Sequence, residues 1–232
     1  PGSRLVYAFL YGSTLTGANL RWAKLNGANL TRANLTGANL SKAYLAGANL
    51  AEVKLDGAIL CHTTMSTGEK VYSNCKNADL GGANLSGANL FKTNLSNADL
   101  TGANLTGANL SRADLTGANL SGADLRNADL SKADLSRASL VHAKFTGANL
   151  TGANLFKANL PEANLTGANL TGANLTEADL FIANLQGINL SGANLNGADL
   201  GGANLTGANL GGAKMKNIRK LDSGIKCKTI VC

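Results

Sequence analysis

The chain has 232 residues and a formal net charge of +7, and 44% of its residues are apolar but only 4% are aromatic. This length allows one domain or two, with enough apolar side chains for a buried core. The apolar residues are nearly all Leu and Ala at regular spacing, which excludes the mixed-shape core of an ordinary globular domain, and no apolar run approaches the about 20 residues of a membrane span.

A five-residue repeat runs through residues 1–215. This range divides into 43 consecutive blocks without a slip of the frame, and 38 of the blocks end in Leu. The residue before the Leu is Asn in 23 blocks and Asp in 8, and the residue two before it is usually Ala. The other residues in the Leu slot are Met65, Lys70, Cys75, Phe145 and Met215. Internal repetition of this kind decides the fold.

The period of five excludes the two common regular structures. In an α-helix, five residues turn the chain by about 500°, so successive Leu residues would spread around the whole helix surface. In a flat strand, an odd period would place successive Leu residues on opposite faces. The chain must therefore coil, with a short extended piece and a turn in each block, and with Leu and Ala pointing inward.

The motif A(D/N)LXX, seen as "TGANLTGANL" and "SGADLRNADL", is similar to that of the pentapeptide repeat proteins over roughly residues 4–215. The resemblance implies an all-β fold, a right-handed quadrilateral parallel β-helix with four blocks to each twenty-residue coil, and thus about eleven coils. The sequence looks most like cyanobacterial and plastid members. The family also includes gyrase-protecting proteins that imitate DNA, so the fold alone does not choose a function.

The first coils carry a group of aromatic and apolar residues. We interpret residues 1–3, "PGS", as a cloning remnant, and so a targeting segment could have been removed before them. Val6, Tyr7, Phe9, Tyr11 and Trp22 follow within two coils. An open solenoid end exposes its core, so we expect these residues to cap the end or to make an end-to-end contact between copies of the chain.

The segment "CHTTMSTGEKVYSNC", residues 61–75, interrupts the repeat without shifting its frame. A charged Lys70 in a dry Leu slot would cost several kcal/mol, so we expect this segment to leave the coil as a loop. The loop residues are Ser66, Thr67, Gly68, Glu69 and Lys70, and the turn falls near Thr67 and Gly68. A loop on a rigid scaffold is a common place for recognition.

The four cysteines allow three interpretations. Cys61 pairs naturally with Cys75 as a staple across the loop, and Cys227 with Cys232 in the tail, which would indicate an oxidising compartment such as a periplasm or a thylakoid lumen. Free thiols in a reducing cytoplasm are the second interpretation. Zinc is the third, because Cys61, His62 and Cys75 are ligand types, but their spacing is wrong for a zinc knuckle and no fourth ligand is evident. We therefore expect no metal and no cofactor.

After residue 75, a coil of twenty residues stacks side chains into columns. Two basic columns result, and they consist of Lys92, Arg112 and Lys132, and of Arg137 and Lys157. Asp114 and Asp134 are placed to offset the first column, which favours a solvated ladder of ions over an acidic partner.

Apolar residues at outward positions indicate a partner surface. Val141, Pro161 and Phe181 fall in one column, Ile182 follows Phe181, and Phe156 lies at the equivalent position of the neighbouring face. A contiguous exposed patch of this kind often marks a binding site, whereas scattered single exposures would carry no meaning.

The chain ends in a basic tail, residues 216–232, with five Lys or Arg against one Asp. Its Lys220 would place a charge in the Leu slot, so we expect the solenoid to end at residue 215. The tail carries +4 of the net charge, which leaves the repeat region nearly neutral, and nucleic acid is therefore not an expected partner.

No catalytic constellation rises above the repeat. His62 and His142 lack the partners of a nucleophile and base pair, and no phosphate-binding loop is present. We therefore expect the protein not to be an enzyme and to have no small-molecule substrate. We expect instead a structural scaffold that presents flat faces to a protein partner. The alternatives are a gyrase-interacting DNA mimic, which the positive charge disfavours, and a binder of an anionic surface through the tail.

Overall fold

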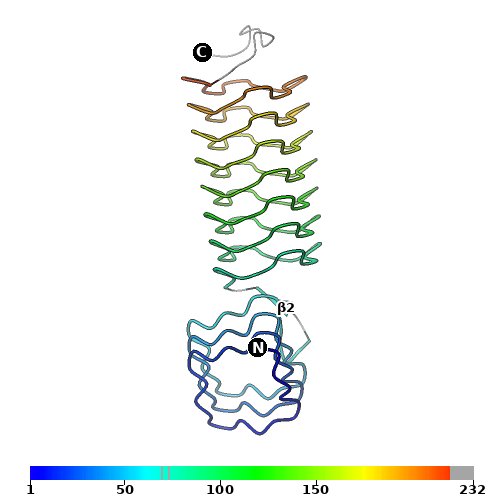
Figure 1. Ribbon diagram of the computed structural model, residues 1–232, viewed down its shortest axis with the longest axis vertical. Helices are drawn as coiled ribbons and strands as arrows, with labels where there is room; N and C mark the ends of the chain where they lie inside the picture. Colours follow the sequence, from blue (N-terminus) through cyan, green and yellow to red (C-terminus); the bar gives the residue numbers. More distant parts are fainter. Residues whose placement is uncertain (69, 73, 220–232) are drawn as a thin grey trace. The chain divides into compact units, whose positions relative to one another are not determined.

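The computed structural model describes residues 1–68, 70–72 and 74–219. Backbone contacts divide the chain into two compact units, Pro1–Ala78 and Asp79–Cys232, which we call unit 1 and unit 2. Each unit is a stack of coils (Figure 1). The described residues contain two regular strands, β1 (Thr63–Thr64) and β2 (Lys70–Val71), and otherwise short extended pieces joined by turns.

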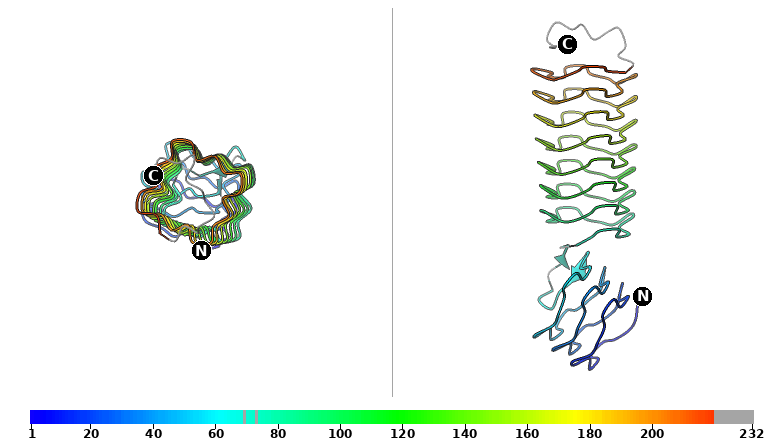
Figure 2. Two further views of the ribbon diagram at one scale, coloured as in Figure 1. Left: turned by 90° about the horizontal axis from the view of Figure 1, so that it is seen from above. Right: turned by 90° about the vertical axis from the view of Figure 1, so that its left-hand side faces the viewer.

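Parallel bridges between residues twenty apart hold each stack together. In unit 1 they run from Arg4↔Lys24 to Tyr44↔Thr64, and in unit 2 from Asp79↔Asp99 to Asp199↔Arg219. One such bridge occurs every five residues, so each coil has four walls, and the expected right-handed quadrilateral β-helix is confirmed. In the end-on view of Figure 2, the coils of unit 2 superimpose on a common outline.

A tight turn joins each wall to the next. The amide of the Ala-slot residue donates to the carbonyl of the preceding Leu, as in Ala163 to Leu160 at 3.1 Å. Two residues lie between them, and we call them the first and second corner positions. The second corner position has a φ near +60° throughout the stack, and a positive φ at this place alone defines a type II turn. This conformation explains why Gly is frequent there.

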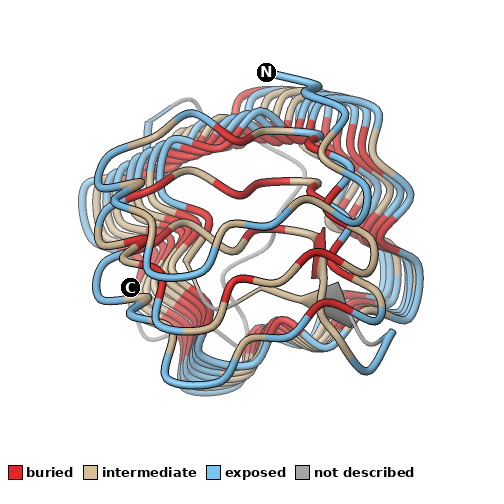
Figure 3. Cartoon of the chain, turned by 90° about the horizontal axis from the view of Figure 1, so that it is seen from below, coloured by how far each residue is buried: buried red, intermediate tan, exposed pale blue. Residues whose placement is uncertain are grey.

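Leu and Ala ladders fill the interior. In unit 2 the Leu side chains from Leu80 to Leu195 are essentially inaccessible, and so is Phe145, which occupies a Leu slot. The Ala slot accepts Thr93 and Ile188 without exposing them. Figure 3 shows that the buried residues lie along the walls and the exposed ones at the corners. The repeat thus supplies a core without any long-range packing of mixed shapes.

The stack of unit 2 continues beyond its expected end. The amide of Leu200 donates to the carbonyl of Arg219 at 3.1 Å, and Arg219 bridges Asp199, four residues past position 215. These bonds use the backbone, so they need no apolar side chain in the next Leu slot. Lys220 and the rest of the tail lie outside the described residues.

Candidate partner-binding surface

The proposed apolar column exists as a stack of corners in unit 2. The amide of His142 donates to the carbonyl of Pro161 at 3.2 Å, and the amide of Glu162 donates to that of Phe181 at 3.0 Å. Val141, Pro161 and Phe181 therefore occupy the first corner position of three successive coils. Proline suits this position because its fixed φ matches the first central residue of a type II turn.

Phe156 lies at the other edge of the same wall. It occupies a first corner position, and the wall residues up to Leu160 separate it from Pro161. The ammonium of Lys157 lies 5.1 Å from the centre of its ring, within cation–π range. We call the surface formed by Val141, Phe156, Pro161, Phe181 and Ile182 the apolar wall.

Ile182 occupies a costly position within the apolar wall. Its φ is +57°, in the left-handed region that disfavours a β-branched side chain. Half of this side chain is exposed, as is a comparable part of Phe181. The next coil places Gly202 under Ile182, because a Cβ at Gly202 would lie 3.2 Å from Ile182 Cγ1. The fold does not require Ile at this corner, since most second corner positions hold Gly or polar residues.

Two exposed contacts between basic and acidic side chains cross between stacked corners at the edges of the apolar wall. Lys157 Nζ lies 3.3 Å from Glu177 Oε2, and His142 Nδ1 lies 3.5 Å from Glu162 Oε2, a contact that is an ion pair only when His142 is protonated. All four side chains are about half exposed, so each contact contributes at most about 1 kcal/mol. The wall is thus an apolar strip with polar side chains along its two edges.

The two basic columns also stack as their spacing predicts. The amide of Lys92 donates to the carbonyl of Ser111, which precedes Arg112, and the amide of Arg112 donates to the carbonyl of Ser131, which precedes Lys132. Lys92, Arg112 and Lys132 therefore lie at the same corner of three successive coils. Within residues 79–219, however, no carboxylate lies within ion-pair distance of Arg112 or Lys132. The wall carboxylates of that range bond instead to the backbone at the next corner, as Asp134 does with Ser136 at 2.9 Å.

Side-chain oxygens of the wall residues cap the turns. In nearly every block, the Asn or Asp Oδ1 accepts the amide hydrogen of the first corner residue, and often the hydroxyl of the same residue. The Thr101 hydroxyl lowers the pKa of Asp99, and the Arg126 guanidinium lowers that of Asp124. These carboxylates are therefore parts of the turn.

The segment 61–75 forms an antiparallel hairpin. Strands β1 and β2 pair with the register Thr63↔Val71 and Thr64↔Lys70, and the amide of Gly68 donates to Met65 at 2.9 Å. The hairpin therefore turns at residues 66–68, and Thr67 and Gly68 are exposed. Glu69 lies outside the described residues.

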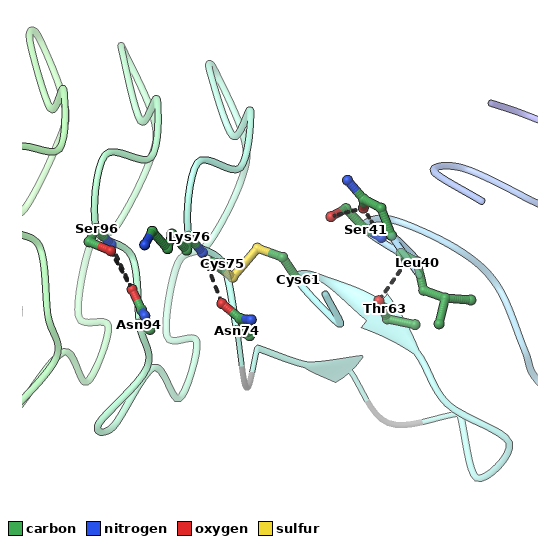
Figure 4. Close-up of a disulfide and its surroundings, with 10 residues drawn as sticks. Leu40, Ser41, Cys61, Thr63, Asn74, Cys75, Lys76, Asn94 and Ser96 are labelled. Carbon is green, nitrogen blue, oxygen red and sulfur yellow. Dashed lines mark hydrogen bonds between the residues drawn. A yellow bond between two sulfur atoms is a disulfide. The ribbon is translucent and has the colours of Figure 1, made fainter. Parts of the chain in front are cut away.

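A disulfide closes the base of the hairpin. Cys61 and Cys75 are joined with an S–S distance of 2.04 Å and a Cα–Cα distance of 4.8 Å, and both side chains are inaccessible (Figure 4). Thr63, between them in the Ala slot, donates from Oγ1 to the carbonyl of Leu40 at 2.7 Å. Cys227 and Cys232, the other proposed pair, lie outside the described residues.

The disulfide leaves no thiolate for a metal at this site. The ring of His62 instead stacks on Tyr72, with centroids 5.6 Å apart, and burial raises the pKa of Tyr72. Across residues 1–68, 70–72 and 74–219, no group of three or more His, Cys, Asp or Glu side chains is arranged to hold a metal ion. Nor does this part of the chain contain a helix long and apolar enough to cross a membrane.

The aromatic residues of the first coils point outward and do not plug the coil. Tyr7 and Phe9 are about four-fifths exposed, and the ring of Phe9 stacks on Tyr11 at 6.2 Å. Two further exposed aromatic residues, Phe91 and Tyr44, were not predicted as surface residues. Phe91 occupies a first corner position, as Phe156 does, so its exposure was predictable from the repeat. Tyr44 occupies the slot that usually holds Asn, and the repeat alone does not indicate how a large side chain lies there.

The model for pentapeptide repeats matches the chain in 8 copies, over residues 2–32, 28–66, 72–107, 108–147, 148–181 and 183–219. Among functionally curated proteins, none shows a sequence match to this chain.

Three solved structures illustrate the similarity. HetL, a pentapeptide repeat protein involved in heterocyst differentiation regulation from the cyanobacterium Nostoc, is 40% identical, with 92% of this chain and 90% of HetL covered and a TM-score of 0.42. A pentapeptide repeat protein from the thylakoid lumen of Arabidopsis thaliana is 38% identical, with 46% and 70% covered and a TM-score of 0.26. One from the cyanobacterium Cyanothece is 44% identical, with 47% and 65% covered and a TM-score of 0.18.

Proposed function

Since the chain belongs to the pentapeptide repeat family, we propose that it is a non-catalytic scaffold that binds a protein partner through the apolar wall of unit 2. Members of this family are generally non-catalytic structural proteins. A rigid stack of coils offers a flat, preorganised surface, and preorganisation lowers the entropy lost on binding. Specificity must then come from the side chains at the corners.

One observation carries the proposal. Ile182 is half exposed and holds a left-handed backbone conformation that a β-branched residue disfavours. It lies beside Phe181 and one coil beyond Pro161, so the exposure is contiguous and not a single apolar residue. A costly residue on an exposed surface points to selection for something other than the fold. An apolar centre with charges at its edges is the usual anatomy of a protein–protein interface.

The test is a photo-crosslinking experiment on the full chain in extracts of the source cells. A photoreactive phenylalanine analogue replaces Phe181 in one sample and Phe91 in the other. Both residues occupy first corner positions of unit 2 and are similarly exposed, so Phe91 is a matched control. We expect a saturable crosslink at position 181, displaced by excess unlabelled protein, and none of that kind at position 91.

Substitution separates this surface from the rest of the chain. The double variant Phe156→Ser and Phe181→Ser should no longer compete for the crosslinked partner, whereas Phe91→Ser should compete like the wild type. Equal competition by the double variant would overturn the apolar wall as the binding surface.

The alternative of a gyrase-interacting DNA mimic has less support. Residues 79–219 contain ten basic and ten acidic residues, whereas a mimic of DNA needs a strongly negative surface. We expect no inhibition or protection of gyrase in a supercoiling assay. An oxidising compartment is our proposal for the location, supported by the Cys61–Cys75 disulfide, and subcellular fractionation tests it.

A further inference from the structure

Unit 1 carries a second surface, on which basic and aromatic side chains share one wall. Parallel bridges stack Arg4, Lys24 and Tyr44 on this wall. Arg21 and Trp22 form the corner that leads to Lys24, and Lys42 lies at the same corner one coil later. We call these six residues the basic-aromatic wall.

The positive charge of the protein is concentrated in unit 1. Residues 1–78 contain eight Lys or Arg against three Asp or Glu, whereas residues 79–219 contain ten of each. The repeat region as a whole is therefore nearly neutral only because a basic unit 1 is averaged with a longer unit 2 whose described residues carry no net charge. Among the described residues of unit 1, neither acidic side chain belongs to the basic-aromatic wall: Glu52 pairs with Arg32 at 2.9 Å at another corner, and Asp56 occupies another block.

The cations and the rings of this wall are held close together. The Arg21 guanidinium carbon lies 4.5 Å from the centre of the Trp22 ring, and the Lys42 ammonium lies 5.8 Å from it. About two-fifths of Trp22 and half of Tyr44 remain exposed. Two cations thus flank an accessible indole, and Tyr44 follows Lys24 one coil along the wall.

The fold does not require these side chains. Trp22 and Lys42 have φ of +57° and +59° at second corner positions, where Gly is the least strained residue. Tyr44 replaces Asn in the wall slot and so provides no side-chain oxygen to cap the next turn. Trp22 and Tyr44 thus depart from the usual residues of their slots on one wall, which indicates a role for the surface itself.

From this geometry we propose that the basic-aromatic wall binds single-stranded nucleic acid. Proteins that bind single strands combine cations that contact phosphates with aromatic rings on which bases stack. The wall supplies both, and none of its six residues carries a carboxylate to repel the phosphates. An acidic protein would use the cations but not the exposed parts of the rings, and a duplex keeps its base faces inside its own stack, so the rings favour a single strand.

Trp22 is the single tryptophan of the chain, so its fluorescence reports directly on the wall. The full chain is titrated with oligothymidylate at several salt concentrations, and the anisotropy of a labelled oligonucleotide gives an independent affinity. We expect saturable quenching of Trp22, with an affinity that falls steeply as salt increases because counterions are released from the phosphates. Absence of both signals at low salt would overturn the proposal.

Heparin and polyglutamate separate stacking from simple attraction of anions. Tyr44→Ser should weaken oligothymidylate binding about tenfold, the typical effect of losing one stacked ring, and leave heparin binding unchanged. Lys24→Gln should weaken both. If Tyr44→Ser has no effect, or polyglutamate binds as tightly as oligothymidylate, the wall is a site for an acidic protein and the proposal fails.

Two matched controls locate the site. Lys54→Gln removes an exposed lysine from a different wall of unit 1, and it should bind oligothymidylate like the wild type. The double variant Lys226→Gln and Lys228→Gln removes two of the lysines in the tail sequence and should also bind like the wild type. Loss of binding in the tail variant with none in Lys24→Gln would assign the affinity to the tail and overturn the proposal. All of these substitutions leave the buried ladders intact, and circular dichroism checks the fold.

Discussion

The side-chain amide of Asn149 donates a 3.1 Å hydrogen bond to Asp129 Oδ1, one coil earlier on the same wall. The Oδ1 atom of Asn149 accepts two more bonds, from the amide of Thr151 at 3.2 Å and from its hydroxyl at 2.7 Å. One side chain therefore links two coils and caps the turn of its own coil.

This linkage predicts how substitutions at Asn149 affect stability. Asn149→Ala removes the cap and should lower the free energy of unfolding by about 1 kcal/mol. Asn149→Asp keeps the capping oxygen but places two carboxylates side by side, so its cost should grow at low salt. Urea unfolding at two salt concentrations measures both effects, and a salt-independent loss in the Asp variant would contradict this account.

Phe145 tests how tightly the interior is packed. It is fully buried in a slot that usually holds Leu, so Phe145→Ala should cost about 3–5 kcal/mol and Phe145→Leu clearly less. The exposed Phe91 is the control, and Phe91→Ala should change the free energy of unfolding by less than about 0.5 kcal/mol. Chemical denaturation of the three variants decides the order, and equal losses at the two positions would refute the assignment of Phe145 to the core.

Ile182 should show a conflict between stability and binding. Ile182→Gly relieves the left-handed strain and should raise the free energy of unfolding by up to about 1 kcal/mol, while weakening capture of the crosslinked partner. Gly122 lies in the same column at a φ of +67°, with open space around its Cβ position, so Gly122→Ile is the reverse control and should destabilise the fold. A stabilised variant with undiminished partner capture would remove Ile182 from the binding surface.

The Cys61–Cys75 disulfide should stabilise unit 1. It closes a loop with a sequence separation of 14, for which the loss of chain entropy in the unfolded state corresponds to about 3 kcal/mol. Reduction, or Cys75→Ser, should lower the stability of unit 1 by roughly this amount. Thiol titration of denatured protein, with and without reductant, checks the bond, and four titratable thiols without reductant would rule it out.

The environment of Asp99 predicts that the free energy of unfolding depends on pH in the acid range. Hydrogen bonds from Thr101 lower its pKa below the ordinary 3.8, so the charged form contributes stability that is present above that value and is lost as the pH falls through the pKa of the folded state. Asp99→Asn keeps the capping oxygen without the charge. The wild type should therefore be slightly more stable than this variant near neutral pH, and the difference should vanish in acid. Urea unfolding across the acid range measures it.

Much of the fold follows from the sequence because its period is regular. The Leu and Ala slots are buried as the repeat indicates, and Phe145 in a Leu slot is buried with them. Periodicity also places Val141, Pro161 and Phe181 in one stack. The coil length of twenty came from the family resemblance, since a period of five is compatible with other numbers of walls. That the two units form one continuous solenoid stays a prediction, as do the roles of the proposed site residues.

Other features depend on information that the period does not carry. Long side chains at the corners can reach several neighbours, and the repeat does not determine which of them they contact. Lys157, for example, contacts both Phe156 and Glu177. Tyr44 replaces Asn in its slot without shifting the five-residue frame, so the sequence gives no reason to assign it a role until its neighbours in the stack are known. The basic-aromatic wall is visible only when residues twenty apart are placed side by side.

The capping oxygen of the wall slot has a consequence for evolution. Because the turn uses Oδ1 alone, Asn and Asp are interchangeable at each such position with little effect on the backbone, and 31 of the 43 blocks hold one or the other. A lineage can therefore change the charge of a stack of coils through single-nucleotide changes that keep every cap. The cost falls where two carboxylates come to lie side by side on one wall, because the bond from Asn Nδ2 to the neighbouring coil is then lost. Net charge can thus vary widely in this architecture while the turns keep the same geometry.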